Sequence, residues 1–269
     1  MFKLLRMDLH RLKKSKSVYI CLGILLMSVA FIFVLLFLTA TPRGQEIAIG
    51  IGMLDRTDVQ EFGGLLSGMT VLDVCRQACI DAGGYTVVIA VLFTIFVCDD
   101  FKNGFIKNIL SVHVNRWEYM GSKMLAFAIV DFIYLMGVYG FSLLFKVLLM
   151  GDSISCDNPG PVFFYLLQAW VLTMAILALV MAVCMLTRSV AAGILTSMLV
   201  GGGVIVSVLN AFLRLFDANK WLEHSIYLSL ANASSVYQQP SDLAGLATGI
   251  IFLILYAVIG GMILTKKDI

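Results

Sequence analysis

Charged residues are scarce in this sequence. Only 13% of the 269 residues are charged, 60% are hydrophobic, and the mean hydropathy is +0.96. Soluble domains are typically about a quarter charged and about half apolar. A soluble core of this size could not bury so much apolar surface, so the composition excludes a soluble domain and indicates a polytopic membrane protein.

Motifs for catalysis and nucleotide hydrolysis are also missing. The sequence contains no HExxH, no GxSxG and no paired carboxylates in an apolar segment, and its three histidines lie outside the predicted spans. These absences argue against an intramembrane protease or metalloenzyme, so we expect no catalytic and no metal-ligating residues. No Walker A sequence is present, so the chain is not expected to hydrolyse ATP or to hold a cofactor itself. The lack of a basic patch with interleaved aromatic residues argues against a nucleic-acid partner.

The six cysteines do not have the spacing of a metal site. Cys75, Cys79 and Cys156 lie in segments predicted on the outer side of the membrane, where one disulfide among them is an option whose connectivity the sequence does not define. The alternative that we favour is that the cysteines are free thiols or small buried apolar residues.

Six apolar segments predict an all-α chain with six transmembrane helices in a single domain covering residues 1–269. A span needs about 20 apolar residues, which the second segment reaches only if the preceding loop feeds into it. We find no internal repeat and no low-complexity linker. The predicted spans are 18–39, 85–98, 124–150, 162–186, 190–213 and 243–264.

Amphipathic segments flank these spans. Residues 1–17 predict a basic amphipathic helix on an anionic membrane surface, with Phe2, Leu5, Leu9 and Leu12 on its apolar face. The apolar run that follows is too long for the core of a signal peptide, so we interpret it as a retained first span. The segments 40–84 and 214–242 predict further amphipathic helices on the opposite side.

Lysine and arginine residues predict the orientation. Thirteen of the 19 lie in the N-terminal segment, in the stretch between the second and third spans, after the fourth span, or in the C-terminal tail. Cytoplasmic loops carry the excess of positive charge. Both termini and the stretch between the second and third spans are therefore expected in the cytoplasm, with the chain in a bacterial cytoplasmic membrane.

The stretch between the second and third spans, residues 99–123, is the longest polar-rich segment with a span on each side. Its apolar positions recur at helical spacing, which predicts a short amphipathic helix at the membrane surface. Glycine within a helix costs about 1 kcal/mol relative to alanine, so Gly104 suggests close approach of another group. We interpret the stretch as a coupling helix that receives force from a soluble partner; the alternative is a loop on the lipid surface. The apolar positions are Phe101, Phe105 and Ile109, and the polar ones include Lys102, Lys107 and Asn108.

Two further features lie inside the spans. Asp131 is the one clear acid within a span, where a charge costs about 2.5–3.5 kcal/mol. It is either a cavity-facing or proton-linked group, or a protonated or hydrogen-bonded aspartate near the cytoplasmic third of the helix, which we favour slightly. The fifth span contains Gly201, Gly202 and Gly203, which predict a kink or close packing. If the glycines have a functional role, we expect them to form a hinge in a moving helix.

Between the second and third predicted spans the sequence contains Asp100, Gly104, Lys107, Asn108, Arg116, Tyr119 and Lys123. With the order of the spans, these residues resemble the permease subunits of type-two ATP-binding-cassette exporters, and most closely the small bacterial branch that handles lantibiotic or other antimicrobial peptides. The family pattern has an acid, a glycine-x-x-lysine, an arginine and a lysine between the second and third spans. The family usually has glutamate where Asp100 stands.

The resemblance implies that the coupling helix docks on a separate soluble ATPase that binds ATP and magnesium. It also implies two ATPase copies and a second permease chain, identical or homologous, within the lipid membrane. Phe101, Phe105 and Ile109 are expected to pack on the ATPase, and Lys102, Lys107 and Arg116 to make polar contacts. The expected ATPase-contact set also includes Asp100, Gly104, Asn108 and Lys123. The main alternative is a membrane protein that binds a peptide as an immunity or sensor protein without pumping it. An ion-coupled carrier is a lesser alternative, because it requires inverted repeats and several intramembrane polar groups.

Overall fold

The computed structural model describes residues 1–53, 68–81, 83–106, 115–151, 153–214, 222, 224–237 and 239–266. Within these residues the secondary structure is helical, apart from one isolated bridge between Thr70 and Ser155. The elements are α1 (Phe2–Lys14), α2 (Lys16–Ala40), α3 (Pro42–Gly50), α5 (Val71–Cys75), η1 (Arg76–Ile80), α6 (Gly84–Lys102), α8 (Arg116–Phe145), η2 (Lys146–Met150), α9 (Pro159–Thr187), α10 (Val190–Thr196), η3 (Ser197–Gly201), α11 (Val204–Arg214), α12 (Ile226–Ala231), η5 (Pro240–Leu243) and α13 (Ala244–Lys266).

Five helices among the described residues are long and apolar enough to cross a membrane: α2, α6, α8 with η2, α9 and α13. A sixth candidate is the pair formed by Val190–Gly201 and α11, which is bent by 49°. The prediction of a helical, multi-pass membrane chain is therefore confirmed. Each of the six predicted ranges carries helix, and the second is longer than predicted because α6 continues to Lys102.

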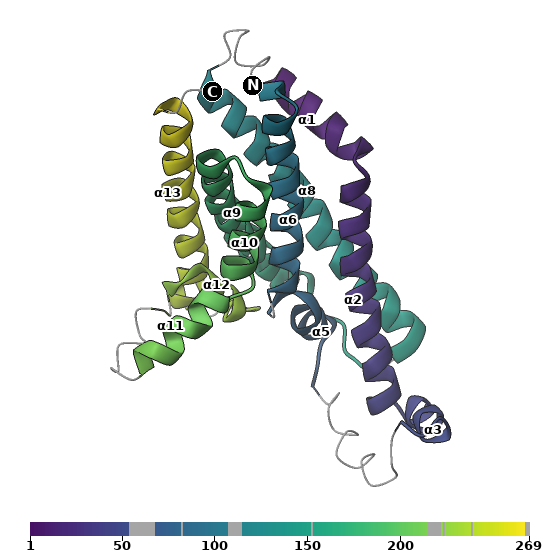
Figure 1. Ribbon diagram of the computed structural model, residues 1–269. Helices are drawn as coiled ribbons and strands as arrows, with labels where there is room; N and C mark the ends of the chain where they lie inside the picture. The colour runs from purple at the N-terminus through teal and green to yellow at the C-terminus, as the bar shows by residue number, and fades with distance from the viewer. Residues whose placement is uncertain are drawn as a thin grey trace.

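The spans surround α9. In α9, 78% of the most apolar stretch is buried, against 17% in α2 and in α13. The apolar outer faces of α2, α8 and α13 suit contact with lipid, because hydrocarbon rather than water surrounds a span. Both termini and α1 lie at one end of the bundle, which we call the termini end, and α3, α5, α11 and α12 lie at the other (Figure 1).

Small residues allow α13 to pack closely on α9. Gly245 and Gly249 form a GxxxG pair at the start of the predicted sixth span. A β-carbon at Gly249 would lie 2.9 Å from the side chain of Val171 on α9. The pair therefore brings the two helices together at a distance that a larger residue would prevent.

The predicted fifth span is not a continuous helix. It breaks at Gly202 and Gly203, and α11 leaves at an angle of 49° without burying any of its own residues. Gly203 has a φ of +70°, and a β-carbon there would lie 2.2 Å from the ring of Tyr227. The structure thus places a bend at the predicted glycine hinge; its movement remains a prediction.

Replacing Gly203 with alanine should destabilise the protein. The positive φ costs an L-residue about 1–2 kcal/mol, and the overlap with the Tyr227 ring adds to that cost. Thermal unfolding of the detergent-purified protein should shift to lower temperature. Gly23→Ala is the control, because a β-carbon at Gly23 meets nothing within 4 Å and alanine favours the helix. Equal melting temperatures for Gly203→Ala and the unmodified protein would contradict this account of the bend.

Candidate functional site

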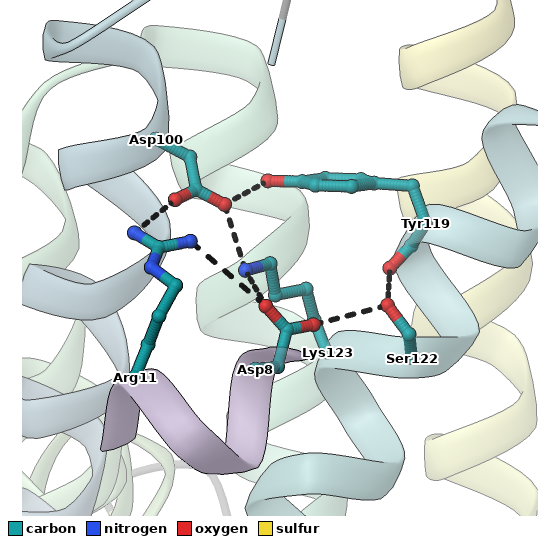
Figure 2. Close-up of polar contacts among 6 residues, drawn as sticks. All are labelled: Asp8, Arg11, Asp100, Tyr119, Ser122 and Lys123. Carbon is teal, nitrogen blue, oxygen red and sulfur yellow. Dashed lines mark hydrogen bonds and ion pairs between the residues drawn. The ribbon is translucent and has the colours of Figure 1, made fainter. Parts of the chain in front are cut away.

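A buried cluster of polar side chains joins three helices at the termini end (Figure 2). We call these six residues the charge cluster: Asp8 and Arg11 from α1, Asp100 from α6, and Tyr119, Ser122 and Lys123 from α8. Asp100 is in the last turn of α6. Tyr119, Ser122 and Lys123 lie in the first turns of α8. The cluster therefore lies at the two ends of the predicted coupling segment, residues 99–123.

Lys123 is at the centre of the charge cluster. Its Nζ lies 2.6 Å from Asp8 Oδ1 and 2.7 Å from Asp100 Oδ2, and its side chain is fully buried. An ammonium has three donor hydrogens. The carboxylates of Asp8 and Asp100 accept two of these hydrogens. The Phe96 ring centroid lies 4.2 Å from Nζ, and the face of an aromatic ring attracts a cation.

The two carboxylates are also held by other groups. Asp100 accepts a hydrogen bond of 2.8 Å from the Tyr119 hydroxyl and pairs with Arg11 Nη2 at 2.8 Å. Asp8 lies 3.2 Å from the Ser122 hydroxyl, which donates to it. Both carboxylates are buried. Hydrogen bonds with an ionised donor or acceptor are stronger than bonds between neutral groups, so the cluster fixes α1 against α6 and α8.

The cluster contains two cations and two anions, so its formal charges cancel. A buried ion network contributes little net stability compared with apolar packing, because desolvation offsets the attraction. Removing one member is costly, since it leaves another charge buried without compensation. The arrangement therefore specifies one way of joining α1, α6 and α8 more than it adds to stability.

The local sequence of α1 explains how this helix places two of its side chains in the charge cluster. Asp8, Arg11 and Leu12 are three or four residues apart and share one side of the helix, where Asp8 and Leu12 are buried. The predicted apolar face is thus interrupted by an acid, and Phe2, predicted on that face, is 83% exposed. Asp8 is the single acid in the first 17 residues, which is the signal that could have identified it.

The boundaries of the coupling segment differ from the prediction. Residues 99–102 complete α6 and residues 116–123 begin α8, so 99–123 is not one continuous amphipathic helix. Gly104 has a φ of +66°, and a β-carbon there would meet nothing within 4 Å. Glycine is therefore needed at 104 for the left-handed turn after α6, and not for close approach of another group. Lys107, Asn108 and Ile109 lie outside the described residues.

Several predicted contact residues make contacts within the chain. Asp100 and Lys123 are buried in the charge cluster, where they pair with groups of the same chain. Arg116 donates hydrogen bonds of 2.8 Å to the carbonyls of Leu264 and Thr265, which joins the start of α8 to the end of α13.

The remaining predicted contact residues differ in exposure. Phe101 and Phe105 are half-buried against the core, and the Arg11 guanidinium lies 4.5 Å from the Phe105 ring centroid. Lys102 is exposed, as is the neighbouring Asn103. The predicted partner contacts that remain accessible in the described part of the segment are therefore centred on Lys102.

Asp131 lies in the protein interior, away from the charge cluster. It is fully buried and accepts a hydrogen bond of 2.5 Å from the Tyr85 hydroxyl. This geometry corresponds to the second sequence interpretation, a hydrogen-bonded aspartate. Within the described residues, no three His, Cys, Asp or Glu side chains gather as a metal site requires.

Comparison with known proteins gives one family match. Residues 83–206 match the family model described as ABC-2 family transporter protein. The matched range contains α6, α8 and α9, and with them every member of the charge cluster except the two from α1. A search of curated proteins finds no match to the chain. The family match, over slightly less than half of the chain, supports a membrane permease component of an ABC-2-type transporter.

Proposed function

We propose that this chain is the transmembrane permease subunit of an ATP-driven exporter. It moves an amphiphilic substrate, a peptide or a lipid-like drug, out of the cytoplasm or the inner leaflet. A separate ATPase subunit binds ATP and magnesium and supplies the free energy. The observation that carries the proposal is the charge cluster, which ties the end of α6 and the start of α8, the two ends of the coupling segment, to α1.

The charge cluster gives the mechanism its physical basis. A force applied at Lys102 acts on the last turn of α6, and the Asp100–Lys123 ion pair passes that force to α8. Arg11 and Asp8 carry α1 along with both helices. Closure of an ATPase dimer on ATP thus moves the three helices together, and two permease chains switch a pathway between the two sides of the membrane.

The proposed substrate class and assembly rest on the resemblance to the lantibiotic and antimicrobial-peptide branch of the family. In this proposal two ATPase copies serve two permease chains, identical or homologous. The large apolar surfaces of α2 and α13 are available for lipid or for the second chain. These surfaces also suit a hydrophobic substrate that enters from the membrane.

Co-purification tests the proposed function. The tagged chain, extracted from its native membrane in mild detergent, should bring down a soluble subunit that hydrolyses ATP. Cells lacking the chain should retain the exported amphiphile, and reintroduction should restore its export. A purified chain that binds a peptide but carries no ATPase and exports nothing would contradict the proposal and favour the immunity or sensor function.

The proposed orientation predicts which cysteine a reagent outside the cell can reach. Cys156 is exposed, and it lies in the segment between η2 and α9, on the side proposed to be external. Cys75 and Cys79 are buried, and burial raises the pKa of the Cys75 thiol to about 12 and also raises the pKa of Cys79, which keeps both unreactive near neutral pH.

A membrane-impermeant maleimide applied to intact cells should therefore label the chain, and Cys156→Ser should abolish that labelling. The Cys79→Ser variant, with Cys156 intact, is the matched control and should label normally. Labelling that requires prior permeabilisation of the cells would place both termini outside and would contradict the proposed orientation.

A further inference from the structure

An apolar slot with a volume of about 430 Å³ opens between α8, α9 and α13. Every residue that lines it lies in one of three helices able to span a membrane. On α8 the lining begins at Trp117 in the first turn, so the slot lies in the half of the bundle nearer the termini end. It is separate from the charge cluster, none of whose six residues lines it.

Small residues create the slot, and two tryptophans border it. Gly121 and Ala128 of α8 and Ala257 of α13 line it where larger side chains would fill it. The Trp170 indole donates a hydrogen bond of 2.9 Å to the Ala128 carbonyl, which fixes that ring as a wall. Trp117 packs against Gly261 of α13, where a β-carbon would lie 2.2 Å from the ring. Both walls are thus held in place by contacts that do not depend on an occupant.

The dimensions of the slot decide between possible occupants. Its lining on α8 runs from Trp117 to Ala128, a length of about 16 Å at 1.5 Å per residue. An α-helix is at least about 10 Å across, so a stretch of that length occupies about 1,200 Å³, well above the volume of the slot. Carbon atoms in contact are about 4 Å apart, so a single hydrocarbon chain fits the slot. A helix from a second copy of the chain does not.

The lipid bilayer around the slot provides hydrocarbon chains that could enter it. The outer faces of α8 and α13 are mostly exposed and apolar, as expected for helices in contact with lipid. A lipid tail gains no transfer free energy on leaving the bilayer, because both environments are apolar. It does gain dispersion contacts with walls on three helices, which bulk lipid does not offer in a fixed geometry.

We propose that this slot binds one acyl chain of a membrane phospholipid from the leaflet at the termini end. The bound chain lies along α8 between Trp117 and Trp170 and fills the space between α8 and α13. The proposal does not require the transport activity, because it concerns the membrane-embedded chain alone.

Quenching of tryptophan fluorescence by brominated lipid tests the proposal directly. The three tryptophans are Trp117, Trp170 and Trp221, so Trp221→Phe leaves only the two that border the slot. This protein, reconstituted without any partner in phosphatidylcholine brominated along one acyl chain, should be strongly quenched relative to the same lipid without bromine. Adding Gly121→Phe fills the slot and should reduce the quenching by about half, because the chain loses its contacts with the walls.

Gly137→Phe in the same background is the matched control. Gly137 lies on the same helix, and neither glycine has close neighbours: a β-carbon at Gly137 meets nothing within 4 Å, and one at Gly121 meets only Met1 Sδ at 3.9 Å. The control should leave the quenching unchanged. Equal quenching in the Gly121→Phe and Gly137→Phe proteins would overturn the proposal, as would weak quenching of the Trp221→Phe protein.

Native mass spectrometry provides a second readout that does not depend on the variants. The detergent-purified protein should retain a phospholipid that the Gly121→Phe protein loses. A retained molecule of another class, such as the exported amphiphile, would contradict the assignment of the slot to phospholipid while leaving the proposed transport function intact.

Discussion

Replacing Lys123 with methionine should destabilise the protein by about 3–5 kcal/mol, the cost of leaving a buried charge without its partner. Lys123 is fully buried and bridges Asp8 and Asp100, so its loss leaves two buried carboxylates with Arg11 alone. Methionine keeps most of the side-chain volume, which separates the charge effect from a cavity effect. The expected measurements are a strong loss of membrane-inserted protein in cells and a lower melting temperature in detergent.

A compensating substitution distinguishes electrostatics from packing. Adding Asp8→Asn to Lys123→Met removes one anion together with the cation and restores the balance of charge in the cluster. The double variant should therefore be more stable than Lys123→Met alone. Lys16→Met is the control, because Lys16 is exposed and surface substitutions typically change stability by less than about 0.5 kcal/mol. If Lys123→Met were as stable as Lys16→Met, the buried ion network would have no structural role.

Reversing the charge of Lys102 should uncouple the ATPase from transport. Lys102 is the exposed basic residue at the end of α6, next to the charge cluster but not part of it. A lysine that contacts an acidic group of the ATPase would, as glutamate, place like charges together, which costs several kcal/mol. Lys102→Glu should therefore reduce permease-stimulated ATP hydrolysis and substrate export by about tenfold or more.

The matched control is Lys14→Glu. Lys14 is also exposed and ends α1 at the same end of the bundle, so it reports on the effect of one reversed charge near the membrane surface. Lys14→Glu should retain most of the activity. The amount of each variant in the membrane should match that of the unmodified protein. Wild-type transport by Lys102→Glu would show that the ATPase does not contact this turn.

The spans could be predicted from the sequence because each is a long apolar run. A run such as that of α2 has no stable alternative to a membrane helix, so its position follows from composition alone. In the fifth span the three glycines predict a kink, but they do not give its angle or its direction. Its apolar residues continue past Gly203, but the left-handed glycine and the Tyr227 ring turn the chain, and Tyr227 comes from a distant part of the sequence.

The charge cluster could be predicted only in part. The resemblance to the exporter family identified Asp100, Tyr119 and Lys123 from their spacing but not their mutual contacts. Asp8 and Arg11 are about 90 residues or more from their partners, and helical periodicity shows which face of a helix is apolar without showing what packs there. Pairing between distant ionised groups depends on the packing of α1 against α8, which a single sequence does not show.

The decisive experiment places a photo-crosslinking amino acid at position 102 of the chain in living cells. We expect an ultraviolet-dependent adduct between this position and a soluble, ATP-hydrolysing subunit, and no such adduct when the crosslinker replaces Lys14. An adduct with an extracellular protein, or crosslinking at 102 to lipid alone in cells that actively export the substrate, would contradict this expectation.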